Sequence, residues 1–203
     1  AIAGWVLPTL IAHGSPDQQE RFISPSLRGE ISWCQMFSEP GAGSDLASLS
    51  TRAERVDGGW SITGQKVWTS MAREADWAIC LARTDAGVTK HQGIGCFLMD
   101  MTTPGIDIRP LRELTGSAMF NEIFLTGVFV PDDCVVGSPT EGWAYARTTL
   151  ANERVSMAEA SSFGPGSGAF RAARSIQPPP ATFSNRKARP RHAHAQLVAP
   201  IKA

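Results

Sequence analysis

SEPGAGSD, residues 38–45, places two glycines, one proline, two serines and two acids within eight positions. A P-loop ends in Gly-Lys-Ser/Thr, and a dinucleotide fingerprint needs a third glycine where this chain has Leu46, so the segment fits neither. Gly41 and Gly43 still allow backbone N–H groups to approach a ligand closely. The alternative interpretation is a Pro-Gly turn on the surface that binds nothing. The rest of the sequence has to decide between the two.

Short apolar runs separated by turn residues surround this segment and predict β-strands. The sequence VDGGW, residues 56–60, predicts a tight hairpin because Asp-Gly and Gly-Gly supply the positive φ that short strand connections need. Pro131 is expected to end the last strand. The predicted strands are ISWCQMF (31–37), SLSTRAERV (48–56), WSITGQKVW (60–68), DWAICLART (76–84), GIGCFLMDM (93–101) and NEIFLTGVFV (121–130).

Helical signals flank the predicted strands on both sides. Residues 1–30 favour helix, with Ser15 as N-cap, Pro16 at the first helical position and Gly29 closing the helix. Residues 140–160 return to helical periodicity. Four apolar residues of this second segment are expected on one face, namely Trp143, Ala146, Leu150 and Met157.

The composition indicates a globular protein with a buried core. Hydrophobic residues make up 42% of the 203 residues, and no apolar run reaches membrane-spanning length. The first residues lack a basic start and a cleavage pattern, so a cytoplasmic protein that does not bind a membrane is expected. Four dispersed cysteines predict buried thiols rather than a metal site or a disulfide framework. These cysteines are Cys34, Cys80, Cys96 and Cys134.

The zero net charge conceals an uneven distribution of charge. Residues 1–159 carry 12 Lys/Arg against 19 Asp/Glu, whereas residues 160–203 carry 7 against none. The second segment is rich in Pro, Gly, Ser and Arg and contains too little apolar surface to offset its ordering entropy. Disorder, or a frame-shifted end, is therefore expected for residues 160–203. Nucleic-acid binding is not expected, because the basic residues lack interleaved aromatic side chains.

Trp68 differs from the other tryptophans because of its neighbours. In GQKVWTS it precedes Thr69 and Ser70 at the end of a predicted strand. A flat ring beside two hydroxyl donors suits a planar heteroaromatic cofactor, which needs a face for stacking and a donor for a ring nitrogen. The other tryptophans are expected in the β-core or at its rim, in particular Trp33, Trp60, Trp77 and Trp143.

Several segments together resemble the FAD-dependent acyl-CoA dehydrogenases, above all their middle β-domain. The resemblance runs from about residue 4 to residue 158 and rests on MFSEPGAGSDLASL, ITGQKVWTS, ADWAICLART, GIGCFLMDMTTPGI, LRELTGSAMFNEIFLTGVFVP and NERV. It implies an α+β fold in which a helical N-terminal piece precedes a central all-β, barrel-like domain and the start of a C-terminal helical bundle. The expected boundaries are 1–30, 31–138 and 139–159, followed by the tail 160–203, so most of the family's C-terminal domain would be missing.

The resemblance also implies which residues contact FAD. Ser38 matches a hydroxyl residue near the isoalloxazine ring, and Ser44 matches a serine near the pyrophosphate. Trp68 would stack on the flavin, and Ser70 would stand at flavin N5 where the family commonly has threonine. The complete expected set for FAD is Phe37, Ser38, Gly43, Ser44, Trp68, Thr69 and Ser70.

The reaction implied by the resemblance is α,β-dehydrogenation of an acyl-CoA thioester. A carboxylate removes the α proton, the β hydrogen leaves as hydride to flavin N5, and hydrogen bonds to the thioester carbonyl stabilise the enolate. Glu153 occupies the position of the base in one branch of the family. In the larger branch the base lies further into the C-terminal domain, and Glu153 is then a solvated helix residue. Arg154 would lie near the CoA or thioester end, and Ser44 would also contact substrate.

The implied setting is fatty acid β-oxidation, with an electron-transferring flavoprotein as acceptor and a homo-oligomeric full-length parent. Two alternatives stay open. One is a flavin-dependent monooxygenase or oxidase built on the same β-domain. The other is a truncated β-domain without catalytic activity, because the tail replaces the helices that complete the bundle.

Overall fold

The computed structural model describes residues 2–162, with side chains through residue 158. Two helices come first, α1 (Ala3–His13) and α2 (Pro16–Leu27). A full capping box confirms Ser15 as the N-cap of α2, because its hydroxyl accepts from the Gln18 N–H and the Gln18 side chain accepts from the Ser15 N–H. Gly29 follows α2 with φ +72°, as expected for a glycine that ends a helix.

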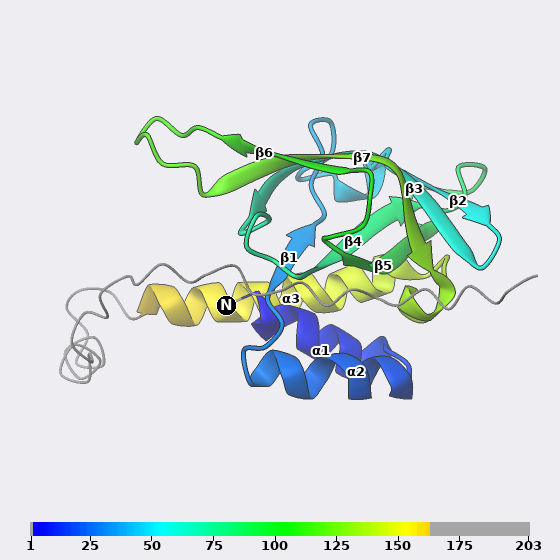
Figure 1. Cartoon of the computed structure of the whole chain (residues 1–203), viewed down its shortest axis with the longest axis horizontal. Coiled ribbons are helices and arrows are strands. Elements are labelled where there is room, and N and C mark those ends of the chain that lie inside the picture. The colour runs from blue at the N-terminus through cyan, green and yellow to red at the C-terminus, as the bar shows by residue number, and fades with distance from the viewer. Residues whose placement is uncertain (1, 163–203) are drawn as a thin grey trace, which may run out of the picture. The chain divides into compact units, whose positions relative to one another are not determined.

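Seven strands form one curled, mixed sheet with the order β1-β4-β2-β3-β7-β6, and β5 pairs with β4 outside this path (Figure 1). The contacts β1–β4 and β2–β4 are parallel, and the remaining pairs are antiparallel. The arrangement agrees with the predicted barrel-like domain. The strands are β1 (Trp33–Met36), β2 (Arg52–Val56), β3 (Gly59–Ser70), β4 (Trp77–Arg83), β5 (Ile94–Asp100), β6 (Ile106–Leu111) and β7 (Phe120–Pro131).

The structure corrects two details of the predicted strands. β6 was not predicted, because its IDIRPL sequence is half-exposed and contains a proline, and it pairs only with β7 at the sheet edge. The second predicted strand starts at Arg52 and not at Ser48, because Leu46–Ser48 forms a 3₁₀ turn and the N–H groups of Ser50 and Thr51 donate to the Glu39 carboxylate. The hairpin of β2 and β3 is confirmed: Val56 pairs with Gly59 across a two-residue loop in which Gly58 has φ +71°.

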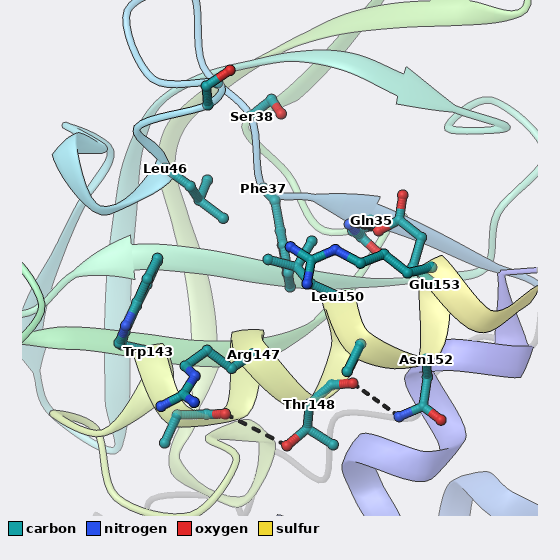
Figure 2. Close-up of a pocket in the computed structure, with 15 residues that line it drawn as sticks. Gln35, Phe37, Ser38, Leu46, Trp143, Arg147, Thr148, Leu150, Asn152 and Glu153 are labelled. Atoms are coloured by element: carbon teal, nitrogen blue, oxygen red, sulfur yellow. Dashed lines mark hydrogen bonds between the residues drawn. The ribbon is translucent and has the colours of Figure 1, made fainter. Parts of the chain in front are cut away.

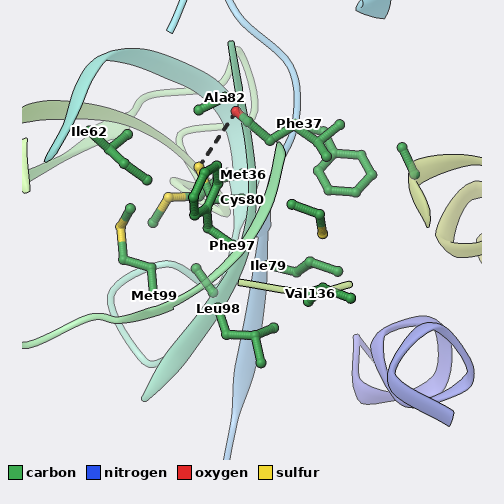
Figure 3. Packing of buried hydrophobic residues seen from close by; sticks show 14 of the residues in the cluster. Met36, Phe37, Ile62, Ile79, Cys80, Ala82, Phe97, Leu98, Met99 and Val136 are labelled. Atoms are coloured by element: carbon green, nitrogen blue, oxygen red, sulfur yellow. Dashed lines mark hydrogen bonds between the residues drawn. The ribbon is translucent and has the colours of Figure 1, made fainter. Parts of the chain in front are cut away.

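The core lies between the inner face of the sheet and the helices. Figure 3 shows Met36 of β1, Cys80 of β4 and Phe97 of β5 in one packed cluster. All four cysteines are buried and free, as predicted. Trp33, Trp60 and Trp77 also lie in or against the core, and Trp143 packs against it from the last helix.

The last described helix, α3 (Gly142–Ser162), lies between the sheet and helices α1 and α2 in the view of Figure 1. Thr9 and His13 of α1 hydrogen-bond to its threonines over 2.8 Å each. Of the four residues predicted on one face of this helix, Trp143, Ala146 and Leu150 pack into or against the core, whereas Met157 is 61% exposed. Most of the segment 160–203, with its predicted disorder, lies outside the described residues. Within residues 2–162, every helix is too short or too polar to span a bilayer.

Candidate functional site

A cavity of about 980 Å³ opens between the segment Gln35–Leu46 and one face of α3 (Figure 2). Its apolar lining includes Phe37, Leu46, Trp143 and Leu150. Two arginines and one glutamate are the charged groups of its lining. Six residues predicted for the site from the sequence line it together, namely Phe37, Ser38, Gly43, Ser44, Glu153 and Arg154.

The loop that lines one side of the cavity is built on a tight turn. The N–H of Glu39 donates to the Ala42 carbonyl and the N–H of Ala42 donates to the Glu39 carbonyl, at 2.9 and 3.1 Å. The Pro-Gly turn expected as an alternative therefore exists, between the lining residues Ser38 and Gly43. Neither Gly41 nor Gly43 has a positive φ, and a Cβ added to either would meet nothing within 4 Å. Nothing within the described chain requires glycine at these two positions.

Two N–H groups that follow this turn are free for a ligand. Among residues 2–162, the backbone N–H groups of Gly43 and Ser44 donate to no acceptor. Open space above a glycine and unpaired N–H groups beside it suit an anionic group that approaches the backbone closely. The loop geometry therefore fits a phosphate or a pyrophosphate at Gly43 and Ser44.

Glu153 reaches the cavity from α3 and contacts β1. The Gln35 amide donates to its Oε2 over 3.2 Å (Figure 2). No cation lies within ion-pair distance of Glu153 in the described part of the chain, in agreement with the sequence spacing to Arg147 and Arg154. A half-buried carboxylate on an amide donor, facing a cavity, is placed to accept a proton from a bound ligand.

Trp68, Thr69 and Ser70 do not line this cavity. They stand at the end of β3, where the register of the pairing with β7 shifts between Lys66 and Thr69. Trp68 is 62% exposed with φ +61°, and its ring meets Phe120 edge-on at 5.9 Å. An exposed aromatic side chain in the left-handed region is unusual, which makes Trp68 a candidate for a functional role.

Thr69 and Ser70 face different environments. Thr69 is 1% exposed, and its hydroxyl oxygen has no hydrogen-bond partner within residues 2–162. Ser70 is half-exposed and follows Trp68 by two positions. Trp68 and Ser70 are thus accessible to a ligand from solvent, whereas the Thr69 side chain is buried.

The two parts of the site are joined directly. The Val67 N–H donates to the Ser38 carbonyl over 2.9 Å, so the residue before Trp68 is bonded to the loop that lines the cavity. Lys66, which is fully buried, donates to the Phe37 carbonyl at 3.2 Å and forms an ion pair with Glu39 at 2.8 Å. Burial by itself raises the pKa of Glu39, but Lys66 and hydrogen bonds from Thr51 and Ser50 outweigh burial and lower the pKa from 4.5 to about 2.

The residues of the loop and of the end of β3 have the chemical groups that FAD binding needs. The exposed Trp68 ring offers a stacking face, the Ser70 and Ser38 hydroxyls offer donors, and the open space at Gly43 with the free N–H of Ser44 suits a pyrophosphate. FAD carries each of these chemical parts. The site therefore has the donors and faces for an elongated, planar, phosphorylated cofactor.

Sequence reasoning missed four residues of this region. Glu39 lies within SEPGAGSD but received no role of its own, and Lys66 received none within its predicted strand. Gln35 is a polar residue in the otherwise apolar strand WCQM, a signal that could have singled it out. Arg147 lines the cavity and received no role in binding from the sequence.

Comparison with known proteins assigns this chain to a protein family. Residues 34–128 match the sequence model described as the acyl-CoA dehydrogenase middle domain. The acyl-CoA dehydrogenase FadE34 of Mycobacterium tuberculosis is 63% identical over 163 residues, which cover 80% of this chain and 23% of that protein. The chain belongs to the acyl-CoA dehydrogenase family.

Solved structures agree with this assignment. The Tcur3481-Tcur3483 steroid ACAD, in its G363A variant, is 35% identical with a TM-score of 0.73, covering 76% of this chain and 40% of that one. The glutaryl-coenzyme A dehydrogenase in complex with glutaryl-CoA is 29% identical with a TM-score of 0.70, covering 75% and 40%. The chain thus spans between 23% and 40% of the lengths of these three proteins.

Proposed function

We propose that this chain contributes the flavin-facing and substrate-facing β-domain of an FAD-dependent acyl-CoA dehydrogenase. The observation that carries the proposal is the cavity in which the loop Phe37–Ser44 faces Glu153 and Arg154 of α3. An acidic side chain and a cation of α3 meet a glycine-rich loop there. This combination suits a thioester substrate that bears a phosphorylated carrier.

The residues proposed to hold FAD are those expected from the sequence. Trp68 offers its exposed face for stacking, Ser70 and Ser38 offer hydroxyl donors, and Gly43 and Ser44 leave room and N–H groups for the pyrophosphate. Phe37 lines the cavity beside them, and Thr69 contributes through its place between Trp68 and Ser70. Bound FAD supplies a two-electron acceptor for the hydride that leaves the β carbon of the substrate.

Glu153 is proposed as the base that removes the α proton. Its carboxylate faces the cavity on a hydrogen bond from Gln35, and no described cation neutralises it. Arg154, the next residue, is proposed to contact the CoA or thioester end, together with Ser44 on the opposite wall. The cavity lining excludes water on its apolar side through Phe37 and Trp143, which strengthens the electrostatic contacts made there.

The proposed substrate class is an acyl-CoA without restriction to fatty acyl groups. One similar structure is that of a steroid ACAD, and another is that of a dehydrogenase with glutaryl-CoA bound. Relatives with such different acyl groups weaken the expectation of fatty acid β-oxidation. Chain length and branching do not follow from the described lining.

Two partners are proposed with the activity. One is an electron-transferring flavoprotein, which would take the electrons from the reduced cofactor. The other is an oligomer of the full-length protein. The similar steroid ACAD bears the names of two proteins, Tcur3481 and Tcur3483, which supports an assembly with a second type of subunit as well as the homo-oligomer expected from the sequence.

The test is the visible absorption spectrum of the purified 203-residue chain after addition of FAD and removal of free FAD by desalting. We expect a retained flavin band with quenched flavin fluorescence, because Trp68 is exposed for stacking. The variant Trp68→Ala should lose this band, whereas Trp5→Phe in α1, outside the cavity lining, should retain it. Absence of the band in the unmodified chain would contradict flavin binding by this chain. Oxygen consumption instead of reduction of an artificial acceptor would favour an oxidase or monooxygenase.

A further inference from the structure

The ion pair between Glu39 and Lys66 is the most deeply buried charged contact in the described part of the chain. The Lys66 side chain is 0% exposed and the Glu39 side chain 3%, and their Nζ and Oε1 atoms are 2.8 Å apart. The other ion pairs within residues 2–162 have partners that are at least 43% exposed. Placing two charges inside a core is expensive, so such a pair needs an explanation beyond stability.

Each partner belongs to a different half of the proposed cofactor site. Glu39 directly follows Ser38 in the loop that lines the cavity, and Lys66 stands on β3 two residues before Trp68. The Lys66 ammonium also donates to the Phe37 carbonyl, and the Val67 N–H donates to the Ser38 carbonyl. Three consecutive loop residues are therefore bonded to two consecutive strand residues.

The carboxylate of Glu39 is saturated with further donors. Its Oε2 accepts from the N–H and the hydroxyl of Ser50 at 2.6 and 2.8 Å, and its Oε1 accepts from the N–H of Thr51 at 3.0 Å. Together with Lys66, these bonds fix the carboxylate in one orientation. The backbone of Glu39 closes the turn to Ala42, so the same residue anchors the loop through both its side chain and its backbone.

The end of β3 also depends on its bonds to the loop. Immediately after Lys66 the pairing with β7 becomes irregular, and Trp68 adopts φ +61° with its ring exposed. A tryptophan in this conformation persists only when its surroundings determine the backbone. The bonds from Lys66 and Val67 to the loop lie directly before the strained residue and determine its backbone from that side.

We propose that Glu39 and Lys66 are a positioning pair that sets the loop Phe37–Ser44 and the segment Trp68–Ser70 in the relative placement that FAD binding requires. This inference rests on the proposed function for its ligand, but the placement of the two segments is measurable without FAD. A pair of apolar residues could fill the same volume with equal or greater stability. Only the charged pair supplies directional bonds to the Phe37 carbonyl and to Ser50 and Thr51.

The test compares three forms of the 203-residue chain. The neutral double variant Glu39→Gln/Lys66→Met removes both charges and keeps similar volumes. The double variant Asp132→Asn/Arg55→Met removes the exposed ion pair between β2 and the turn after β7 and serves as the matched control. Each form is labelled with 5-fluorotryptophan, and the Trp68 ¹⁹F resonance is assigned by its absence in Trp68→Phe.

Without FAD, we expect the neutral double variant to shift or split the Trp68 resonance while the Trp33 and Trp60 resonances keep their positions. With FAD, we expect its affinity to be at least about tenfold lower than that of the unmodified chain, the equivalent of one lost hydrogen bond to a charged group. The control variant should match the unmodified chain in its Trp68 resonance and in its FAD affinity. Its Trp60 resonance is expected to move, because the Arg55 guanidinium lies over the Trp60 ring, 5.4 Å from the ring centroid. A folded neutral variant with an unchanged Trp68 resonance and unchanged FAD affinity would overturn the proposal.

A second variant covers the case in which the neutral double variant does not fold. Glu39→Asp keeps the charge but shortens the side chain by one methylene, so it cannot hold Lys66, Ser50 and Thr51 at their present distances. For this variant we expect a shifted Trp68 resonance and weaker FAD binding. If both match the unmodified chain, the pair is needed only for folding and the proposal is overturned. If the unmodified chain binds no FAD, the proposed function fails. The Trp68 resonance of the same variants still tests whether the pair sets the position of the segment Trp68–Ser70 relative to the loop Phe37–Ser44.

Discussion

Glycines serve two different purposes in this chain, as Gly43 and Gly58 illustrate. Gly58 has φ +71° in the hairpin of β2 and β3, where an L side chain would be strained. Gly43 has no positive φ, and a Cβ there would meet nothing within 4 Å. The first glycine is therefore required by the fold. The second is not required by the described chain, and we propose that it leaves room for the pyrophosphate of the cofactor.

This difference predicts opposite effects of the same substitution. Gly58→Ala should lower the free energy of unfolding by about 1 kcal/mol because of its left-handed backbone. Gly43→Ala should leave the free energy of unfolding within about 0.5 kcal/mol of the unmodified value but weaken FAD binding about tenfold. Urea unfolding and flavin titration of both variants measure these effects. Full FAD affinity of the Gly43→Ala variant would show that the pyrophosphate does not bind at Gly43.

Glu153 gives the second prediction at the residue scale. If this carboxylate removes the α proton, Glu153→Gln should slow the reduction of bound flavin by a saturated acyl-CoA roughly 10²- to 10⁴-fold, while FAD stays bound. Anaerobic single-turnover absorbance measures the rate. Glu54→Gln on the exposed face of β2 is the matched control and should react normally. Reduction of Glu153→Gln at the unmodified rate would assign the base to another residue.

At the scale of elements, α2 is held firmly at its first turn. Its capping box with Ser15 satisfies N–H groups at the helix start, and the Gln18 amide donates to the carbonyls of Asp133 and Val135 at 2.7 and 2.8 Å. The cap residue thus also orients the side chain that ties the helix to the segment after β7. This contact fixes the N-terminal helices against the sheet.

The cap predicts a measurable loss of stability. Ser15→Ala should lower the free energy of unfolding by about 1 kcal/mol, with a melting temperature lower by about 2 to 4 °C. Ser15→Asp retains a capping oxygen and should stay close to the unmodified protein. Thermal unfolding followed by circular dichroism compares the three forms. Equal losses in both variants would show that the hydroxyl acts through a contact other than the cap.

At the scale of the whole molecule, the buried pair links stability to pH. The pKa of Glu39 is lowered from 4.5 to about 2 in the folded chain, because Lys66 and the hydrogen bonds outweigh the opposing effect of burial. A carboxyl with a lowered pKa contributes stability that is complete above its unfolded pKa and is lost as the pH falls toward its folded pKa. The affected window therefore runs from about pH 5 down to about pH 2.

The neutral double variant Glu39→Gln/Lys66→Met isolates this contribution. The free energy of unfolding of the unmodified chain should fall relative to that of the variant by about 3 kcal/mol between about pH 5 and pH 2. Urea unfolding at several pH values measures the difference. The exposed-pair variant Asp132→Asn/Arg55→Met should show a smaller change, because solvent screens that pair. Parallel curves for the neutral variant and the unmodified chain would contradict the lowered pKa.

Several features of the fold could be predicted because they depend on local signals. The N-cap at Ser15, the hairpin at Gly58 and the helix that starts near Thr140 each follow from residues within a few positions. β6 escaped prediction because it is a half-exposed edge strand whose only partner is β7. The exposure of Met157 could not be predicted, because helical periodicity shows which residues share a face but not where the packing partner of that face ends.

The sequence by itself determined the order of the helices and of every strand except β6, the family and the segments that carry the candidate site, because motif spacing and turn chemistry are local properties of the chain. Only the tertiary structure decided which of these segments meet. It brought Glu153 to Gln35 and the loop at Gly43, kept Trp68 outside that cavity, and buried Glu39 against Lys66. Such contacts join residues 27 to 118 positions apart, and their energies depend on burial and direction that no local pattern records.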